Sequence, residues 1–205
     1  MDKNRLPKTS RPKRYEIKLD IDLNNFSYEG IENIELEVLE NTNSIFLNSL
    51  GIEVTSASLE VDKKEVNILS VEYLEDEERI CLSSENEIVK GSYILHIKFK
   101  SDITDDLKGF YKSKYLTKEN EEKWIATTQF EPTSARNAFP CWDEPEYKAV
   151  FSITIIADKK LLRVSNEKVL EEKETKDNKV ETTFVDSMKM STYLVAFVVG
   201  ELEAT

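Results

Sequence analysis

The residues able to carry chemistry gather in one stretch, WIATTQFEPTSARNAFPCWDEPEYKAVFSITI, from Trp124 to Ile155. It contains both tryptophans, three of the five prolines and one of the two cysteines. Cys141 offers a thiol nucleophile, but such a nucleophile needs a base nearby. Three clustered carboxylates resemble the acid and base of a general acid–base site, although carboxylates beside prolines are more typical of turns. They are Asp143, Glu144 and Glu146.

The single histidine restricts the chemistry further. His96 lies in GSYILHIKFKS, on the polar face of a predicted strand together with Lys98 and Lys100. One histidine excludes an HExxH helix and any site with two histidine ligands. A Ser-His-Asp triad would have to use His96, and no nucleophile elbow lies near it. We therefore interpret His96 as a surface residue and expect no independent hydrolase.

The rest of the stretch favours a structural role. Phe139 and Trp142 are residue types that belong to cores more often than to cofactor sites. Arg136 could pair with Asp143 or Glu144, and such ion pairs hold loops more often than they catalyse. Prolines stiffen turns and keep a loop from joining a sheet. They are Pro132, Pro140 and Pro145.

Composition indicates a soluble globular chain of 205 residues, of which 40% are hydrophobic and 33% charged. No run of about 18 apolar residues predicts a transmembrane helix. The basic start MDKNRLPKTSRPKR leads into no apolar segment and does not resemble a secretory signal. The net charge of −12 argues against nucleic acid as a partner, because nothing would offset phosphate repulsion. Cys81 and Cys141 form no CxxC pair and are expected to be free thiols.

Alternating apolar and polar residues predict strands along nearly the whole chain. The alternation is clean over residues 15–23, 28–38 and 91–103. About a dozen such strands predict an all-β fold, an antiparallel β-sandwich or a strongly curved pair of sheets. Little helix is expected beyond a short turn in PTSARNAF, capped by Thr133 or Ser134. The apolar run from Tyr193 to Val199 predicts a strand buried on both faces.

Three segments, taken in order, resemble one known family. LKGFYKSKY, TTQFEPTSARNAFPCWDEPEYKAVFSITI and MSTYLVAFVVGELE are similar to the N-terminal domain of the aminopeptidase N family of zinc metallopeptidases, most of all the puromycin-sensitive type. RLPKTSRPKRYEIKLDIDL and YEGIENIELEV resemble the first strands of that domain. The resemblance therefore covers almost the whole chain.

The resemblance implies a saddle-like all-β domain that precedes a catalytic domain. In the family, the next domain carries the zinc site and the GxMEN substrate loop, and this sequence contains neither HExxH nor GxMEN. Residues 1–205 are therefore expected to form a single non-catalytic N-terminal domain without a cofactor of its own. Zinc would belong to the full-length parent, and this chain alone should be inactive.

The resemblance also implies two substrate-binding residues. Gln129 corresponds to a residue that lines the pocket for the substrate's first side chain, and Glu131 to one that binds the substrate's α-ammonium group. A free α-amino group has a pKa of about 7.7–8 and is mostly charged at neutral pH, so a carboxylate can hold it through charge-assisted hydrogen bonds. The surface that meets the catalytic domain is expected around Phe130, Phe139 and the final strand.

A second hypothesis is a stand-alone β-sandwich binding module without enzymatic activity, since fold alone does not fix function. Under the first hypothesis, that of a non-catalytic aminopeptidase domain, the partners are peptides, which the chain and the catalytic domain together hold by their free N-terminus. No nucleic-acid partner and no membrane segment in this chain are expected. A cytoplasmic location is expected from the missing signal, the few cysteines and the similarity to cytosolic members.

Overall fold

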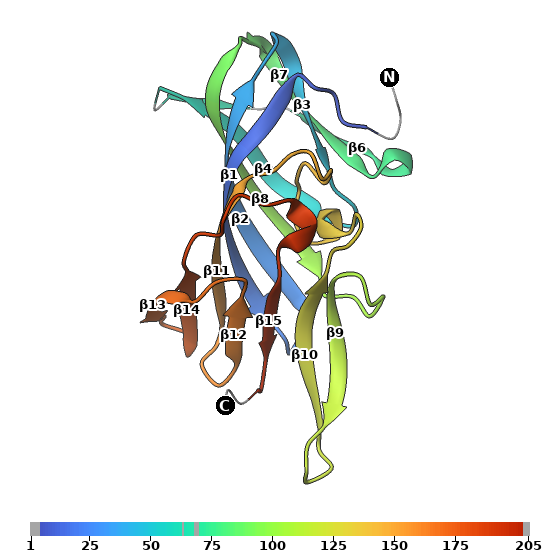
Figure 1. Cartoon of the computed structure of the whole chain (residues 1–205), viewed down its shortest axis with the longest axis vertical. Coiled ribbons are helices and arrows are strands. Elements are labelled where there is room, and N and C mark those ends of the chain that lie inside the picture. Colours follow the sequence, from blue (N-terminus) through green and yellow to red (C-terminus); the bar gives the residue numbers. More distant parts are fainter. Residues whose placement is uncertain (1–4, 63, 68–69, 203–205) are drawn as a thin grey trace.

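The computed structural model describes residues 5–62, 64–67 and 70–202, and the expected domain of residues 1–205 extends beyond these ranges. Strands dominate the fold (Figure 1). They are β1 (Ser10–Asp22), β2 (Ser27–Val38), β3 (Thr42–Asn48), β4 (Glu53–Val61), β5 (Lys64–Asn67), β6 (Ser70–Leu74), β7 (Arg79–Ile88), β8 (Gly91–Asp102), β9 (Gly109–Leu116), β10 (Glu122–Gln129), β11 (Val150–Asp158), β12 (Leu162–Ser165), β13 (Val169–Glu174), β14 (Lys179–Phe184) and β15 (Phe197–Gly200). The helices described are 3-10 turns, η1 (Glu75–Glu77), η2 (Ala135–Asn137) and η3 (Thr192–Leu194). No helix in these ranges has the length and apolar character that crossing a membrane requires.

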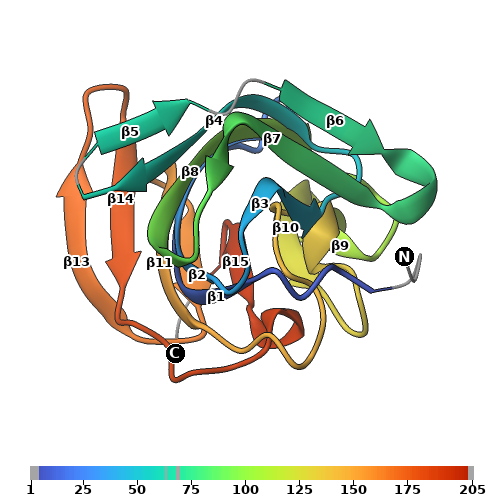
Figure 2. The ribbon, with the colours of Figure 1, turned by 90° about the horizontal axis from the view of Figure 1, so that it is seen from above.

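The strands form three sheets. An eight-stranded sheet has the order β13-β14-β11-β1-β2-β8-β4-β5, a four-stranded sheet the order β12-β15-β10-β9, and a three-stranded sheet the order β3-β7-β6. Figure 2 shows the eight-stranded sheet curving so strongly that β5 comes to lie on the same side of the molecule as β13 and β14. The predicted all-β sandwich with little helix is confirmed.

The predicted antiparallel pairing holds for every pair of neighbouring strands described except one. β1 runs parallel to β11, with Arg14 opposite Val150 and Asp20 opposite Ile156. Parallel neighbours need a long crossover connection, and here residues 23–149 supply it by building most of the other strands before the chain returns. Sequence alternation shows which residues face inward, but it carries no information about strand direction.

The long central strands bury one face in the way their alternation predicts. On β1, Tyr15, Ile17, Leu19 and Ile21 are almost completely buried, and the residues between them are more exposed. Gly30 interrupts the apolar series of β2, since a Cβ there would lie 2.2 Å from the Phe99 ring of β8. Glycine at this position lets an aromatic ring lie directly against the strand backbone.

A chain of aromatic contacts connects the sheets across the core. The rings of Tyr15 and Phe151 stack at 4.9 Å, and Tyr15 also meets Phe139 edge-on at 6.3 Å. Phe139 contacts Phe130 at 5.9 Å, which leads to the remaining rings of the chain. These are Phe197, Phe110, Tyr28 and Phe99, each in edge contact with the one before. Edge-to-face geometry of this kind adds about 0.5–1.5 kcal/mol per pair beyond burial.

The end of the chain differs from its prediction. Instead of one strand buried on both faces, residues 192–194 form η3 and a strand begins only at Phe197. Burial alternates there, since Val195, Phe197 and Val199 are buried and Leu194 is 48% exposed. The helical turn predicted in PTSARNAF is present as η2, but Ser134 makes no side-chain capping bond there.

Glu32 is an exception to the apolar core. It lies on the inward face of β2, between Ile17 of β1 and Ile97 of β8. Its side chain is fully buried, and neither carboxylate oxygen has a hydrogen-bond partner among the described residues. Burial raises the pKa of Glu32 well above its ordinary value, because the ionised form would lose its hydration.

We expect Glu32→Gln to stabilise the fold increasingly as pH rises. In the unfolded chain Glu32 loses its proton near its ordinary pKa of about 4.5, whereas the folded chain retains that proton to higher pH. The native state then binds more protons, so its free energy of unfolding falls as pH rises above that value. Glutamine does not ionise, and the gain should reach about 1–3 kcal/mol at pH 8.

Urea unfolding of both proteins between pH 4.5 and pH 8 measures this gain. Glu35→Gln is the matched control, because Glu35 is an exposed glutamate on the same strand. A stability difference between Glu32→Gln and the parent chain that stays constant with pH would contradict the burial of an unpaired carboxylate.

Candidate functional site

The two residues singled out by sequence lie together at one end of β10. Gln129 is the last residue of the strand and Glu131 follows two residues later, and both side chains are exposed. Phe130 between them is buried, with 2% of its surface exposed. The amide Nε2 of Gln129 donates to the backbone carbonyl of Glu131 at 3.5 Å. Alternation along the chain thus directs both polar side chains outward, on either side of a core anchor.

Gln129 belongs to the outer face of the four-stranded sheet. It pairs with Gly109 on β9, and Thr127, two residues earlier, lies between Tyr111 on β9 and Val198 on β15. Val198 in turn pairs with Val164 of β12, which is 43% exposed. Because successive residues alternate between faces, Val164, Val198 and Thr127 lie on the same face as Gln129. The two valines are partly exposed apolar residues of this face.

Glu131 begins a short turn that is fixed to the core. The amide of Ser134 donates to the carbonyl of Phe130 at 2.8 Å, and the peptide between Glu131 and Pro132 is cis. Within the described part of the chain, the Glu131 carboxylate makes no hydrogen bond or ion pair. It is therefore free to bind a ligand.

The structural role predicted for most of the stretch, from Pro132 to Pro145, is clearest between Ala138 and Asp143, which we name the buried segment because every residue in it is buried. Tyr28 donates its hydroxyl to the carbonyl of Ala138 at 2.9 Å, and the amide of Trp142 donates to the hydroxyl oxygen of Tyr15 at 3.1 Å. Asn48 of β3 exchanges backbone hydrogen bonds with Cys141 at 2.7 and 3.0 Å. The core role predicted for Phe139 and Trp142 is confirmed, since both are fully buried.

Of the contact surface predicted around Phe130, Phe139 and the final strand, the two phenylalanines are wrong. Phe139 is fully buried and Phe130 nearly so, because both rings belong to the aromatic chain of the core. The neighbouring apolar residues that do reach the surface lie on the outer face of the four-stranded sheet, at Val164 and Val198. The sequence could not distinguish them from core residues because their exposure depends on the pairing of β12 with β15.

Arg136 pairs with Asp143, as one of the two predicted options. Its Nε lies 3.0 Å from the Asp143 carboxylate, and a second bond runs to Glu78 at 2.9 Å. Glu144 has a different partner, Arg5, at 2.6 Å. Glu78 was missed by sequence reasoning, because nothing local indicates a partner 58 residues away.

Neither His96 nor the cysteines form a reactive site. The two ring nitrogens of His96 contact Asn33 at 2.7 Å and Glu60 at 3.2 Å on the outer face of the eight-stranded sheet. Cys81 and Cys141 are free thiols, as predicted, and the structure shows that both are buried. Burial raises the pKa of the Cys141 thiol well above its ordinary value, and the nearby Asp143 carboxylate acts in the same direction.

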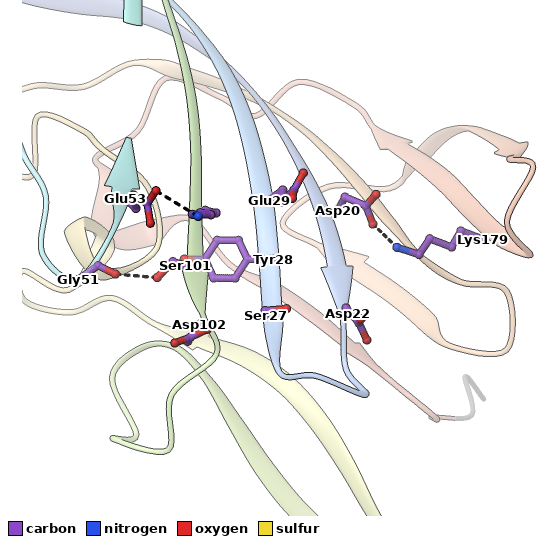
Figure 3. Close-up of a pocket in the computed structure, with 11 residues that line it drawn as sticks. Asp20, Asp22, Ser27, Tyr28, Glu29, Gly51, Glu53, Ser101, Asp102 and Lys179 are labelled. Carbon is purple, nitrogen blue, oxygen red and sulfur yellow. Dashed lines mark hydrogen bonds and ion pairs between the residues drawn. The ribbon is translucent and has the colours of Figure 1, made fainter. Parts of the chain in front are cut away.

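A hollow of about 600 Å³, whose lining includes neither Gln129 nor Glu131, lies on the outer face of the eight-stranded sheet (Figure 3). Its charged residues are mostly paired, since Lys179 binds Asp20 and Lys100 binds Glu53. We interpret it as the solvated face of the sheet. Across residues 5–62, 64–67 and 70–202, no three His, Cys, Asp or Glu side chains are grouped so that they could hold a metal ion.

Sequence comparison shows the family to which the chain belongs. A profile of the Peptidase M1 N-terminal domain matches residues 11–194, and the chain belongs to this family. Similar proteins include aminopeptidase 2 of Candida albicans, 39% identical over 96% of this chain, and puromycin-sensitive aminopeptidase of Caenorhabditis elegans, 37% identical over 97%. Endoplasmic reticulum aminopeptidase 1 of Rattus norvegicus is 33% identical over 98%.

The alignments cover 21% of the Candida and nematode proteins and 22% of the rat protein, so the chain spans about a fifth of the length of these relatives. The predicted resemblance to the aminopeptidase N family is confirmed. The relatives are named aminopeptidases, and the family model that matches this chain describes the N-terminal domain of M1 peptidases.

The Cys141 thiol should be unreactive in the folded protein. In a Cys81→Ser variant, we expect Ellman's reagent at pH 8 to react with Cys141 only after unfolding in guanidinium, because the raised pKa and the burial both suppress the thiolate. Counting the thiols released with and without denaturant checks this. Reaction of the native variant at the rate of a free cysteine would contradict the packing of the buried segment.

Proposed function

We propose that this chain is the N-terminal, non-catalytic domain of a zinc-dependent aminopeptidase that removes N-terminal residues from peptides. In this role it contributes Glu131 to the recognition of the substrate's α-ammonium group, and Gln129 to the pocket for the first side chain. The observation that carries the proposal is the geometry of these two residues, which are exposed on either side of the buried Phe130.

The Glu131 carboxylate fits the chemistry of a peptide's amino terminus. It is exposed and has no partner within the described ranges, so no internal ion pair must be broken before it binds a ligand. A charged α-ammonium group in a closed site would form charge-assisted hydrogen bonds with it. Binding the terminal amine also fixes the distance to the first peptide bond, and such positioning contributes strongly to rate.

The apolar face next to Gln129 supports a composite site. Val198 and Val164 are paired apolar residues on this face, and Val164 is 43% exposed. Packing of the peptidase domain against this face would place Gln129 at the edge of the interface between the two domains. Glu131 would lie beside it.

The described residues do not fit a zinc ion, since they bring no suitable ligands together. We therefore assign zinc to the peptidase domain of the parent protein and derive no step through it here. The inactivity of this chain alone stays a prediction, which turnover of an aminoacyl chromogenic substrate by the purified chain would contradict. A cytoplasmic location likewise stays a prediction.

Glu131→Gln tests the proposal in a full-length aminopeptidase carrying this domain. Loss of a charged hydrogen bond should lower kcat/KM for peptides with a free N-terminus by about 100-fold, or roughly 2.7 kcal/mol. Steady-state kinetics on one peptide series measures this loss.

Glu122→Gln is the matched control, because Glu122 is an exposed glutamate at the opposite end of the same strand. Its kinetics should equal those of the parent. If Glu131→Gln leaves kcat/KM unchanged, Glu131 has no part in binding the amine.

A further inference from the structure

We propose that Arg136 is a positioning residue that acts through Glu131, by fixing the turn from which the Glu131 carboxylate projects. This inference rests on the proposed function of Glu131. It assigns Arg136 no contact with the substrate.

The turn has an anchor on each side. Before it, the Phe130 ring packs against Phe139 at 5.9 Å and Phe197 at 6.0 Å. After it, Arg136 lies in η2, and its side chain is only 12% exposed. Because no side-chain bond holds the Glu131 carboxylate within the described ranges, the point from which its side chain projects is set by these two anchors and the backbone between them.

Arg136 connects the turn to the buried segment by several bonds. Its Nε donates to the Asp143 carboxylate at 3.0 Å, its Nη2 to the Asp143 carbonyl at 3.3 Å, and its backbone amide to the same carboxylate at 3.3 Å. Asp143 is itself held, since it accepts from the Thr192 hydroxyl at 3.0 Å and donates its amide to Asn48 at 3.1 Å. Arg136 thereby ties the turn to the chain before β15 and to β3.

The remaining bonds of Arg136 reach the three-stranded sheet. Its Nη1 donates to Glu78 at 2.9 Å, and its carbonyl accepts from the amide of Leu50 at 2.9 Å. Glu78 precedes β7, and its carbonyl accepts from Ser49, the residue after β3. The guanidinium group thus joins carboxylates from two separate parts of the fold.

This arrangement uses the shape of arginine as well as its charge. A planar guanidinium has five donors in a fixed fork, whereas a lysine ammonium is a compact charge on a flexible stem. Arg136→Lys should therefore preserve the charge while losing the simultaneous bonds to Asp143 and Glu78. The turn would then sample positions in which Glu131 no longer meets the amine, and misplacement by about 1 Å can cost up to 100-fold in rate.

A double-mutant cycle between Arg136→Lys and Glu131→Gln tests the inference in the full-length aminopeptidase. We expect Arg136→Lys to lower kcat/KM for free-N-terminus peptides about tenfold. In the Glu131→Gln background the same change should have less than about a twofold effect, because the residue it acts through is already gone. A merely structural role would lower activity equally in both backgrounds.

Arg163→Lys is the matched control. Arg163 is similarly buried, at 8% exposure, and donates to Thr182 and Glu172 on other strands. Its replacement should leave the kinetics unchanged. If Arg136→Lys does not fold, Glu78→Gln replaces it in the cycle, since Glu78 is 45% exposed and supplies one outer bond.

The outcomes separate this inference from the one it rests on. If Glu131→Gln has no effect, the proposed function fails. If Glu131→Gln lowers kcat/KM but the Arg136 and Glu78 variants have no effect, or the same effect in both backgrounds, then the positioning role of Arg136 is overturned while Glu131 keeps its own.

Discussion

The fold depends on the burial of one irregular segment, Ala138–Asp143, at the place where three sheets meet. Tyr15 and Tyr28 bind it from the eight-stranded sheet, and Asn48 pairs with it from the three-stranded sheet. Thr192, just before β15, binds its last residue. A sheet needs another element to bury its apolar face, and here the segment supplies the shared surface. Its density in aromatic residues and prolines follows from this position.

Polar groups in this region follow two different rules. Arg136 and Asp143 are buried but satisfied by several bonds each, so the cost of removing them from water is largely offset. Glu32 has no such partner, and it can be accommodated because protonation makes it neutral. The bonds between Arg136 and Asp143 fix the position of the turn. The buried Glu32 carboxyl makes the stability of the same core depend on pH.

The sequence predicted structure correctly where that structure depends on local alternation, or on contacts between residues close together in the chain. The inward residues of β1 follow directly from a period of two, and Arg136 lies close enough to Asp143 for their pairing to be foreseen. It failed where partners come from far along the chain. The parallel pairing of β1 with β11, the Arg136–Glu78 bond and the exposure of Val164 all depend on sheet order, which no local pattern encodes.

Gln129 and Glu131 were predicted from the family resemblance, because no local pattern of residues marks them as binding groups. They lie on either side of Phe130, so the alternation that drives one ring into the core directs two polar side chains outward. The core therefore fixes the backbone of the candidate site, because the buried Phe130 lies directly between Gln129 and Glu131. In the proposed function, these two residues are the binding groups that the domain supplies to its neighbour. The geometry around Glu131 is then set by the burial of Phe130 and by the bonds of Arg136.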